Sequence, residues 1–115
     1  MITQVTEQHG IYIAGFRDLK RFTLASTEDV RNELKPLLVK GSIRLIFDLG
    51  NIEFIDSSGI GCIISLVKTA KSNQSEIRLC NISKEVMEII HLLRLEMILN
   101  IEKNVENALQ AFQNK

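Results

Sequence analysis

The spacing of hydrophobic positions between residues 43 and 72 changes once, and the change separates a strand from a helix. Residues 43–49 read Ile-Arg-Leu-Ile-Phe-Asp-Leu. This nearly continuous apolar run is typical of a strand buried on both faces of a parallel sheet. Apolar residues then recur at i, i+3, i+4 and i+7, as Ile60, Ile63, Ile64 and Val67. This second spacing predicts a helix from about residue 57 to residue 71 with one apolar stripe against the sheet.

Asp56 stands immediately before this helical pattern and is its predicted N-cap. Its carboxylate can accept a hydrogen bond from the backbone N–H of Ser58 or Gly59, and its charge suits the positive end of the helix dipole. Ser58 therefore lies in the first turn of the predicted helix. Residues 50–56 follow the carboxyl end of the predicted central strand, which is where open α/β sheets usually carry their site.

The face of this helix opposite its apolar stripe consists mostly of small residues. At about 100° per residue, one face collects Ser58, Gly61, Ser65, Lys68, Thr69 and Ser72. So few large side chains leave room for another surface to approach the backbone closely. We therefore expect a partner to bind through Ser58, Gly61, Ser65 and Thr69. A solvated face with no partner remains the alternative, because small polar residues are common on such faces.

The rest of the chain alternates between strand and helix patterns. Residues 2–15 predict a hairpin around Gly10, and residues 16–25 show neither period and are expected to form a loop. Ser26 or Thr27 is the predicted cap of a helix that ends at Gly41, and Pro36 is expected to kink or break that helix.

The second half repeats the alternation. Residues 77–82 predict a strand, and Ser83 is expected to cap a third helix. The chain then runs through residues 97–99 to a last short strand, and Asn104 is expected to cap a terminal helix. The order favours one α/β domain over residues 1–115, with a mostly parallel mixed sheet, an antiparallel strand from the N-terminal hairpin and about four α-helices.

Composition and charge exclude several classes of function. The chain has 14 basic and 14 acidic residues, so its formal net charge is zero and no global field favours nucleic acid or an anionic membrane. No apolar run reaches the roughly 20 residues that span a bilayer, and the polar start argues against a signal peptide. We therefore expect a cytoplasmic protein. Cys62 and Cys80 are too few and too scattered for a disulfide framework and are predicted to be reduced, structural thiols.

Several of these segments, taken in order, resemble the signature of STAS domains and, among them, of anti-sigma factor antagonists. The resemblance rests on residues 45–49, Ile52 and residues 54–61, extends through residues 77–82 and 98–101 to residues 105–109, and covers roughly residues 43–112. In that family the second Ser of Asp-Ser-Ser-Gly is the phosphoacceptor. The resemblance thus implies phosphorylation of Ser58, with motif and positioning roles for Asp56, Ser57, Gly59 and Gly61.

Two segments depart from the family pattern. Residues 15–18 match the usual Gly-x-x-Asp, but several extra residues follow before the helix, so the partner contacts made there are open. A glycine usually expected after the third helix is replaced by about Arg94, so that helix is expected to end without an easy left-handed cap.

The resemblance implies an antagonist in a bacterial partner-switching pathway. The unphosphorylated form would bind an anti-sigma factor that is also an ATP-dependent serine kinase and so release the sigma factor. Phosphorylation of Ser58 would switch it off, and a serine phosphatase would reverse this. ATP would belong to the partner, so no cofactor or metal is expected here. The alternative is a STAS adaptor in a transporter complex or sensory scaffold.

Catalysis by the chain itself is not expected. A nucleophilic Ser58 would need a base, and neither of the two histidines, His9 and His91, has supporting context. The sequence also lacks a Gly-x-Ser-x-Gly elbow, a phosphate-binding P-loop and paired Cys/His metal spacing.

Overall fold

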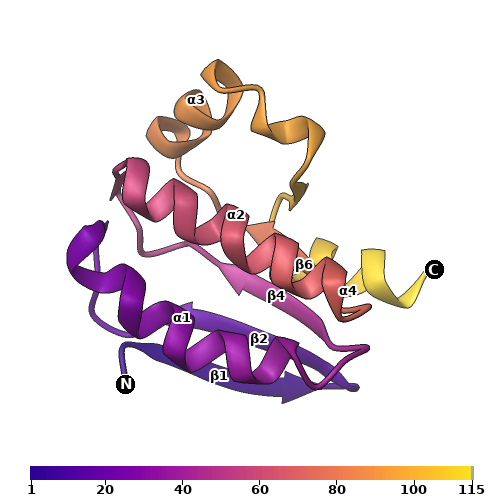
Figure 1. Cartoon of the computed structure of the whole chain (residues 1–115). Coiled ribbons are helices and arrows are strands. Elements are labelled where there is room, and N and C mark those ends of the chain that lie inside the picture. The colour runs from indigo at the N-terminus through magenta and orange to yellow at the C-terminus, as the bar shows by residue number, and fades with distance from the viewer. Residues whose placement is uncertain (115) are drawn as a thin grey trace.

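The computed structural model of the chain describes residues 1–114, and within this range the helices and strands alternate as the hydrophobic pattern predicts. The strands are β1 (Thr3–Gln8), β2 (Ile11–Phe16), β3 (Arg21–Phe22), β4 (Arg44–Asp48), β5 (Phe54–Ile55), β6 (Glu76–Cys80) and β7 (Asn100–Glu102). The helices are α1 (Leu24–Leu38), α2 (Ser57–Ser72), α3 (Lys84–Leu92) and α4 (Val105–Gln113), with a short 3-10 helix at Leu95–Met97. Figure 1 shows their arrangement.

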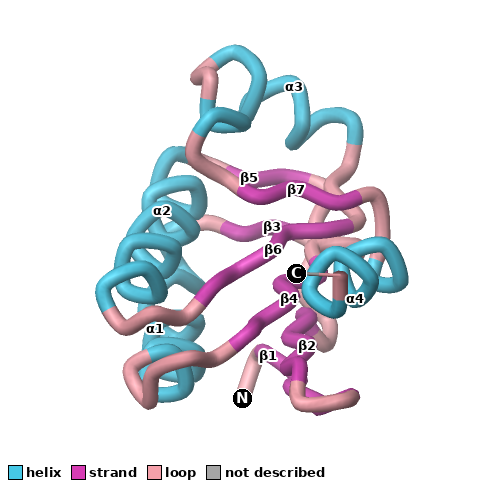
Figure 2. Tube along the Cα trace, turned by 90° about the vertical axis from the view of Figure 1, so that its right-hand side faces the viewer, coloured by secondary structure: helices cyan, strands magenta, loops and turns pink. Residues whose placement is uncertain are grey.

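The main sheet has five strands in the order β1-β2-β4-β6-β7. β1 is antiparallel to β2 and every other pairing is parallel, so the expected mixed α/β fold with an antiparallel hairpin strand is confirmed. Helices α1 and α2 lie on one face of the sheet and α4 lies on the other (Figure 2). β4 is central and apolar on both faces: Leu45 and Phe47 belong to one buried cluster, and Ile46 to the other.

The hairpin turn consists of the two residues between β1 and β2. His9 and Gly10 both have positive φ, 55° and 78°. Two-residue turns of this kind match the right-handed twist of the flanking strands, which fixes the register that pairs Gln8 with Ile11. The expected N-terminal hairpin is therefore confirmed.

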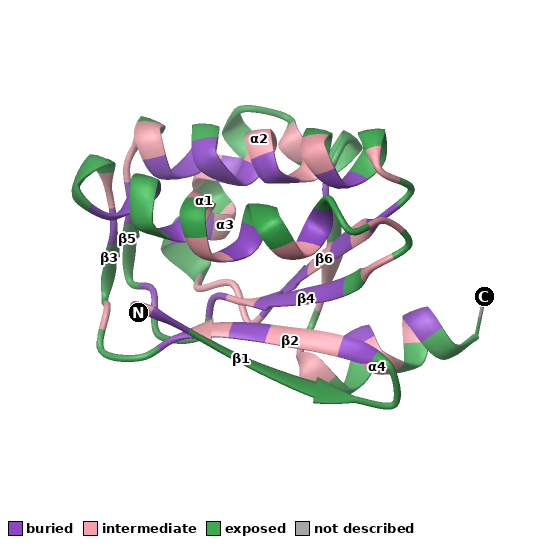
Figure 3. Ribbon diagram, turned by 60° about the horizontal axis from the view of Figure 1, so that its bottom comes forward, coloured by how far each residue is buried: buried purple, intermediate pink, exposed green. Residues whose placement is uncertain are grey.

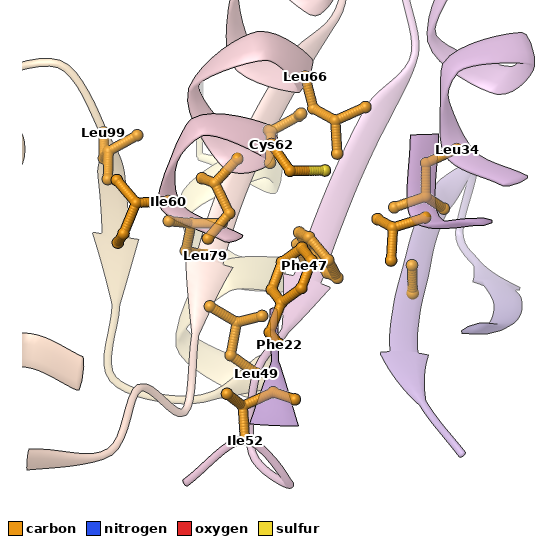
Figure 4. Packing of buried hydrophobic residues seen from close by; sticks show 14 of the residues in the cluster. Phe22, Leu34, Phe47, Leu49, Ile52, Ile60, Cys62, Leu66, Leu79 and Leu99 are labelled. Carbon is orange, nitrogen blue, oxygen red and sulfur yellow. The ribbon is translucent and has the colours of Figure 1, made fainter. Parts of the chain in front are cut away.

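Residues 16–25 do not form the loop that the pattern suggested, because β3 lies within them. Phe22 is fully buried and contacts the rings of Phe16 and Phe47, with centroids 5.2 and 6.4 Å away. Figure 4 shows Phe22 beside Phe47 in the core. β3 pairs in parallel with β5, Phe22 lying opposite Ile55. A pairing of two residues shows no period in the sequence, which is why the pattern missed it.

Helix α1 begins earlier than predicted. Its N-cap is Thr23, so Ser26 and Thr27 lie inside the helix, where both are buried. The Ser26 hydroxyl accepts a hydrogen bond from the Thr23 N–H (3.3 Å) and donates to the Thr23 carbonyl (3.1 Å). These contacts tie the first turn back to the cap residue and explain how a Ser near the helix start can be mistaken for the cap.

Pro36 does not break α1, which continues to Leu38. The proline removes one backbone donor, but the Val39 N–H still donates to the Lys35 carbonyl at 3.1 Å. Leu34 and Leu38, on either side of Pro36, are both fully buried. Packing of these two residues thus holds the last turn in helical geometry.

The expectation that α3 would end without a left-handed residue is wrong. Arg94 itself adopts that conformation, with φ 56° and ψ 33°. Its N–H donates to the His91 carbonyl at 3.0 Å, and the 3-10 helix follows at once. Arg94 is exposed, so its side chain meets no packing constraint in this backbone geometry, and only the intrinsic cost of a non-glycine residue remains.

Glu33 on α1 fastens that helix to the start of β1. Its carboxylate accepts hydrogen bonds from the N–H groups of Ile2 and Thr3, at 3.1 and 2.8 Å, and from the Thr3 hydroxyl. Burial of the carboxylate opposes its ionisation, but the hydrogen bonds from Thr3 and Ile2 outweigh that effect and lower the pKa of Glu33. The ionised carboxylate is therefore the form that stabilises the fold.

We expect Glu33→Gln to lower the melting temperature at pH 7, and the difference from wild type to shrink as the solution is acidified. The folded pKa lies below the ordinary value of 4.5, so the stabilisation is complete above that pH and is lost as the pH falls through the folded pKa. Thermal unfolding between pH 7 and pH 3 measures the difference. Glu28→Gln, at an exposed position of α1, is the control. A Glu33→Gln difference that stays constant with pH would contradict this role.

Candidate functional site

One carboxylate, that of Asp56, serves the first turns of two helices. Its Oδ1 accepts a hydrogen bond from the Gly59 N–H of α2 at 2.9 Å, which confirms Asp56 as the N-cap of this helix. Its Oδ2 accepts from the N–H of Leu24, the first residue of α1, at 3.3 Å. The negative charge thus lies at two positive helix ends. The sequence predicted only the first of these contacts.

The pairing of β3 with β5 brings the two helix starts together. Each strand leads almost directly into a helix, β3 into α1 and β5 into α2. The Asp56 N–H donates to the Phe22 carbonyl at 3.3 Å, and the Glu53 N–H donates to the Lys20 carbonyl at 2.8 Å. Figure 3 shows α1 and α2 side by side, with β3 and β5 at the end where both helices begin.

Gly59 is required where the first turn of α2 meets β3. A Cβ at this position would lie 2.4 Å from the Phe22 carbonyl oxygen and 2.6 Å from the Ile55 Cγ1, both closer than real contacts allow. Gly61, two residues further along the helix, is exposed, and a Cβ placed there would have no atom within 4 Å. The two glycines of the motif therefore have different roles. Gly59 allows α2 to pack against β3, and Gly61 leaves the exposed face of α2 without a side chain at this position.

Ser58 lies in the first turn of α2, as predicted, and is partly exposed, while Ser57 is exposed. Within residues 1–114 the Ser58 hydroxyl makes no hydrogen bond to another protein group. His91 bonds to the Glu96 carboxylate, and His9 lies in the β1–β2 turn. Among the described residues, no hydrogen bond joins either imidazole to the Ser58 hydroxyl.

Three of the four residues predicted to bind a partner line one groove between α1 and α2. They are Gly61, Ser65 and Thr69, and the other lining residues are Lys35, Val39, Ile64, Lys68, Ser72 and Asn73. Ser58 precedes the groove by one turn of the same helix. Lys35 and Lys68 are charged, and none of the described lining residues is acidic. The groove can therefore receive a convex surface that is neutral or acidic.

A polar network holds the loop that leads to the site. Asp48 Oδ1 accepts hydrogen bonds from the Gly50 N–H at 2.9 Å and from the Asn81 side chain at 3.0 Å. The Asn51 amide donates to the Phe16 carbonyl at 2.9 Å. These contacts join the carboxyl ends of β2, β4 and β6 and fix the path of residues 50–56. The sequence predicted a site at this edge of the sheet but did not identify the network.

Three residues at the site had no signal in the hydrophobic pattern. Leu24 is 72% exposed and Phe54 is 41% exposed, although both are large and apolar. The Arg21 guanidinium lies over the Phe54 ring, 4.2 Å from its centroid. Arg21 and Leu24 fell in the expected loop, and only the β3–β5 pairing shows that they lie at the Ser58 turn.

Both cysteines are free and buried, as expected. Burial raises the pKa of Cys62, whose Sγ lies 3.7 Å from the Thr27 carbonyl. Burial and the carboxylates of Asp48 and Glu102 raise the pKa of Cys80 to about 12. Both thiols therefore stay protonated at neutral pH and are poor nucleophiles.

Comparison with known families gives a match over most of the chain. Residues 4–108 match the family described as the STAS domain. The chain belongs to the STAS domain family. The anti-sigma-B factor antagonist of Listeria monocytogenes is 30% identical over 101 residues, 88% of this chain and 83% of that protein. BtrV of Bordetella bronchiseptica, named a putative anti-sigma factor antagonist, is 28% identical over 89 residues, 77% of each chain.

Solved structures of STAS proteins share the fold. An anti-sigma-factor antagonist domain protein from Planctomyces limnophilus superposes with a TM-score of 0.85 at 20% identity, covering 95% of this chain and 96% of that one. The anti-sigma factor antagonist SpoIIAA has been solved unphosphorylated, with a TM-score of 0.79 at 16% identity over 98% of this chain and 97% of its own. Its phosphorylated form, described as a Bacillus cell fate determinant, gives 0.71 at 15% identity over 96% and 98%.

The same fold occurs as part of a larger membrane protein. The murine anion transporter Slc26a9 matches with a TM-score of 0.80 at 21% identity, over 96% of this chain and 19% of that one. Identities this low show the fold alone. In residues 1–114 of the present chain, no helix combines the length and the hydrophobicity needed to cross a membrane.

The two glycines of the motif should respond in opposite directions to alanine. We expect Gly59→Ala to lower the free energy of unfolding by about 1–3 kcal/mol, because the Phe22 backbone or the Ile55 side chain must move. We expect Gly61→Ala to raise it by up to about 1 kcal/mol, because alanine is the better helix former and meets nothing. Urea denaturation of both variants measures the difference, and equal effects would contradict the assigned roles.

Replacement of Asp56 should distinguish a single cap from a shared one. Asp56→Ala is expected to cost more than the roughly 1 kcal/mol of an ordinary N-cap, because two backbone N–H groups lose their acceptor. Asp56→Asn should fall between Ala and wild type, since an amide oxygen can serve one N–H while its NH₂ faces the other. Urea denaturation tests this order.

The reference for one lost cap is Ser83→Ala, which removes the N-cap hydroxyl of α3 that accepts a hydrogen bond from the Val86 N–H. An Asp56→Ala effect no larger than that of Ser83→Ala would show that the Leu24 contact adds nothing to stability.

Proposed function

We propose that this chain is an anti-sigma factor antagonist and that Ser58 is the residue through which it is switched. The observation that carries the proposal is the position of a partly exposed serine residue in the first turn of α2. This serine lies next to the Asp56 cap and one turn before the groove lined by Gly61, Ser65 and Thr69. The names of the curated relatives support the role. The existence of SpoIIAA in unphosphorylated and phosphorylated forms supports a phosphoryl switch on this fold.

In the proposed reaction this chain is a substrate and has no catalytic role. The Ser58 oxygen attacks the γ-phosphorus of ATP bound to an anti-sigma factor with serine kinase activity. The bond from that phosphorus to the β–γ bridging oxygen breaks, and ADP leaves. A base of the kinase takes the hydroxyl proton. ATP and its metal ion belong to the kinase, and a serine phosphatase hydrolyses the phosphoserine to restore Ser58. The role is cytoplasmic, because sigma factors act inside the cell.

The free domain can accept the phosphate without unfolding. A phosphoserine carries about −1.5 to −2 charges at neutral pH. At residue 58 this charge lies near the N-termini of α1 and α2, where backbone N–H groups and helix dipoles favour anions. The Asp56 carboxylate repels it locally. The added charge is therefore balanced within the fold and leaves its packing intact.

At the partner surface the same phosphate is unfavourable. Gly61, Ser65 and Thr69 present a low surface to which a partner can pack closely. Insertion of a phosphate at the end of this surface adds bulk and requires desolvation of a dianion, which costs up to several kcal/mol and hence orders of magnitude in affinity. Phosphorylation thus releases the anti-sigma factor, while the unmodified form holds it.

An adaptor role is the second candidate, because the fold also occurs in the transporter Slc26a9. In that role the chain would hold a partner through the same surface without phosphoryl transfer. Incubation with the kinase partner and ATP separates the two roles: transfer to Ser58 supports the switch, and stable binding without transfer supports the adaptor.

We expect Ser58→Ala to bind the anti-sigma factor as wild type does but not to be phosphorylated. The probes are purified anti-sigma factors with a serine kinase domain from the same genome, with Mg-ATP. Mass spectrometry locates the phosphate, and calorimetric titration measures affinity. The phosphorylated protein and Ser58→Asp should each bind at least about tenfold more weakly, equivalent to about 1.4 kcal/mol.

Ser57→Ala is the matched control and should be phosphorylated and released like wild type. Ser65→Arg, in the groove, should weaken binding of the unmodified protein while the fold persists. Equal affinity for the phosphorylated and unmodified forms, or transfer to Ser57 in place of Ser58, would disprove the switch.

A further inference from the structure

Two large apolar side chains lie exposed where α1 and α2 begin. Leu24, the first residue of α1, is 72% exposed, and Phe54 of β5 is 41% exposed. The Leu24 N–H reaches Asp56 Oδ2 at 3.3 Å, and Phe54 precedes Asp56 by two residues. Thus two residues with exposed apolar side chains, one at the start of α1 and one just before α2, flank the Asp56 cap that precedes Ser58.

Arg21 completes this group. It is exposed, lies opposite Phe54 in the β3–β5 pair, and its guanidinium is 4.2 Å from the centroid of the Phe54 ring. Such stacking pre-orders both side chains and so lowers the entropy that a partner must remove on binding. Aromatic residues and arginine are also the types enriched at the energetic centres of protein interfaces.

Phosphoryl transfer determines which molecule covers these residues. The γ-phosphate must come within bonding distance of the Ser58 oxygen, so the kinase must lie against the first turn of α2. A standard interface buries about 800 Å² on each partner, much more than one helical turn supplies. The contact must therefore spread to neighbouring segments, and the start of α1 shares the Asp56 carboxylate with that turn.

We propose that Leu24 and Phe54, with Arg21 stacked on Phe54, form the anchor through which this chain docks on its kinase-type anti-sigma factor. The inference rests on the proposed function and adds the chemistry of the partner: an apolar pocket for Leu24 and Phe54, bordered by an acidic side chain that faces Arg21. The anchor is separate from the groove lined by Gly61, Ser65 and Thr69. It contributes to binding, whereas Ser58 takes part in the reaction.

The test compares Leu24→Ala with Val5→Ala. Val5 is 38% exposed on the edge strand β1 and is a surface apolar residue away from the Ser58 turn. Leu24→Ala keeps the backbone N–H that bonds to Asp56, so its melting temperature should match wild type. With the kinase-type anti-sigma factor that binds wild type, we expect at least about tenfold weaker binding and a correspondingly higher KM, with kcat unchanged. Val5→Ala should behave as wild type.

Phe54 requires two variants, because part of its ring is packed. Phe54→Ala should weaken binding, whereas Phe54→Leu, which keeps an apolar side chain, should recover most of the affinity. If Phe54→Ala unfolds, Leu24→Ala, which keeps all backbone contacts, still decides the matter. Arg21→Glu should weaken binding and Arg21→Lys should weaken it less.

The outcomes separate this inference from the proposed function. If no serine kinase anti-sigma factor binds or phosphorylates wild type, the proposed function fails and the anchor fails with it. If wild type is bound and phosphorylated but Leu24→Ala and the Phe54 variants keep wild-type affinity and KM, only the anchor is disproved. A fall in kcat at unchanged KM would also disprove it, because an anchor acts on binding.

Discussion

The sharing of the Asp56 carboxylate between α1 and α2 is the contact on which the geometry of the site depends. A single acceptor group satisfies one N–H in each helix, so neither helix can shift along its axis without breaking a hydrogen bond to Asp56. The short β3–β5 pair supports this arrangement, because it aligns the residues that immediately precede both helices. The position of Ser58 therefore depends on contacts among two helices and two strands, although the residue itself lies in a single helical turn.

The close approach of α2 to β3 explains the composition of the motif. The helix start touches the Phe22 carbonyl so closely that only glycine fits at position 59. Ring contacts among Phe16, Phe22 and Phe47 hold β3 in the core. The first turn of α2 packs on β3, so this buried packing also fixes the position of Ser58. Gly61 has no such constraint. A helix that keeps a glycine at an open position gives up helical stability there, and close approach of a partner is the physical gain that could offset the loss.

Electrostatics gives the Ser58 turn two opposing preferences. The converging helix ends favour an anion, and Asp56 already supplies one. A second anion on Ser58 is thus stabilised by the helices and destabilised by its neighbour, which leaves the free domain nearly indifferent to phosphorylation. A partner surface lacks this compensation. The difference between the two environments is what would convert a small covalent change into a large change in affinity.

The sequence by itself determined most of the elements and the cap at Asp56, because both depend on local periodicity and on short-range hydrogen bonding. The apolar runs at residues 43–49 and 60–67 specified the central strand and the helix, and the spacing of Asp56 and Gly59 specified the cap. The start of α1, the left-handed Arg94 and the strand at Arg21–Phe22 were not predicted correctly, since each depends on contacts that the local pattern does not contain. Only the tertiary structure decided that Leu24 lies beside the Asp56 cap and that one carboxylate serves two helices. Residues 24 and 56 are far apart in the chain, and the contact between them exists only because a buried phenylalanine at position 22 draws β3 against β5.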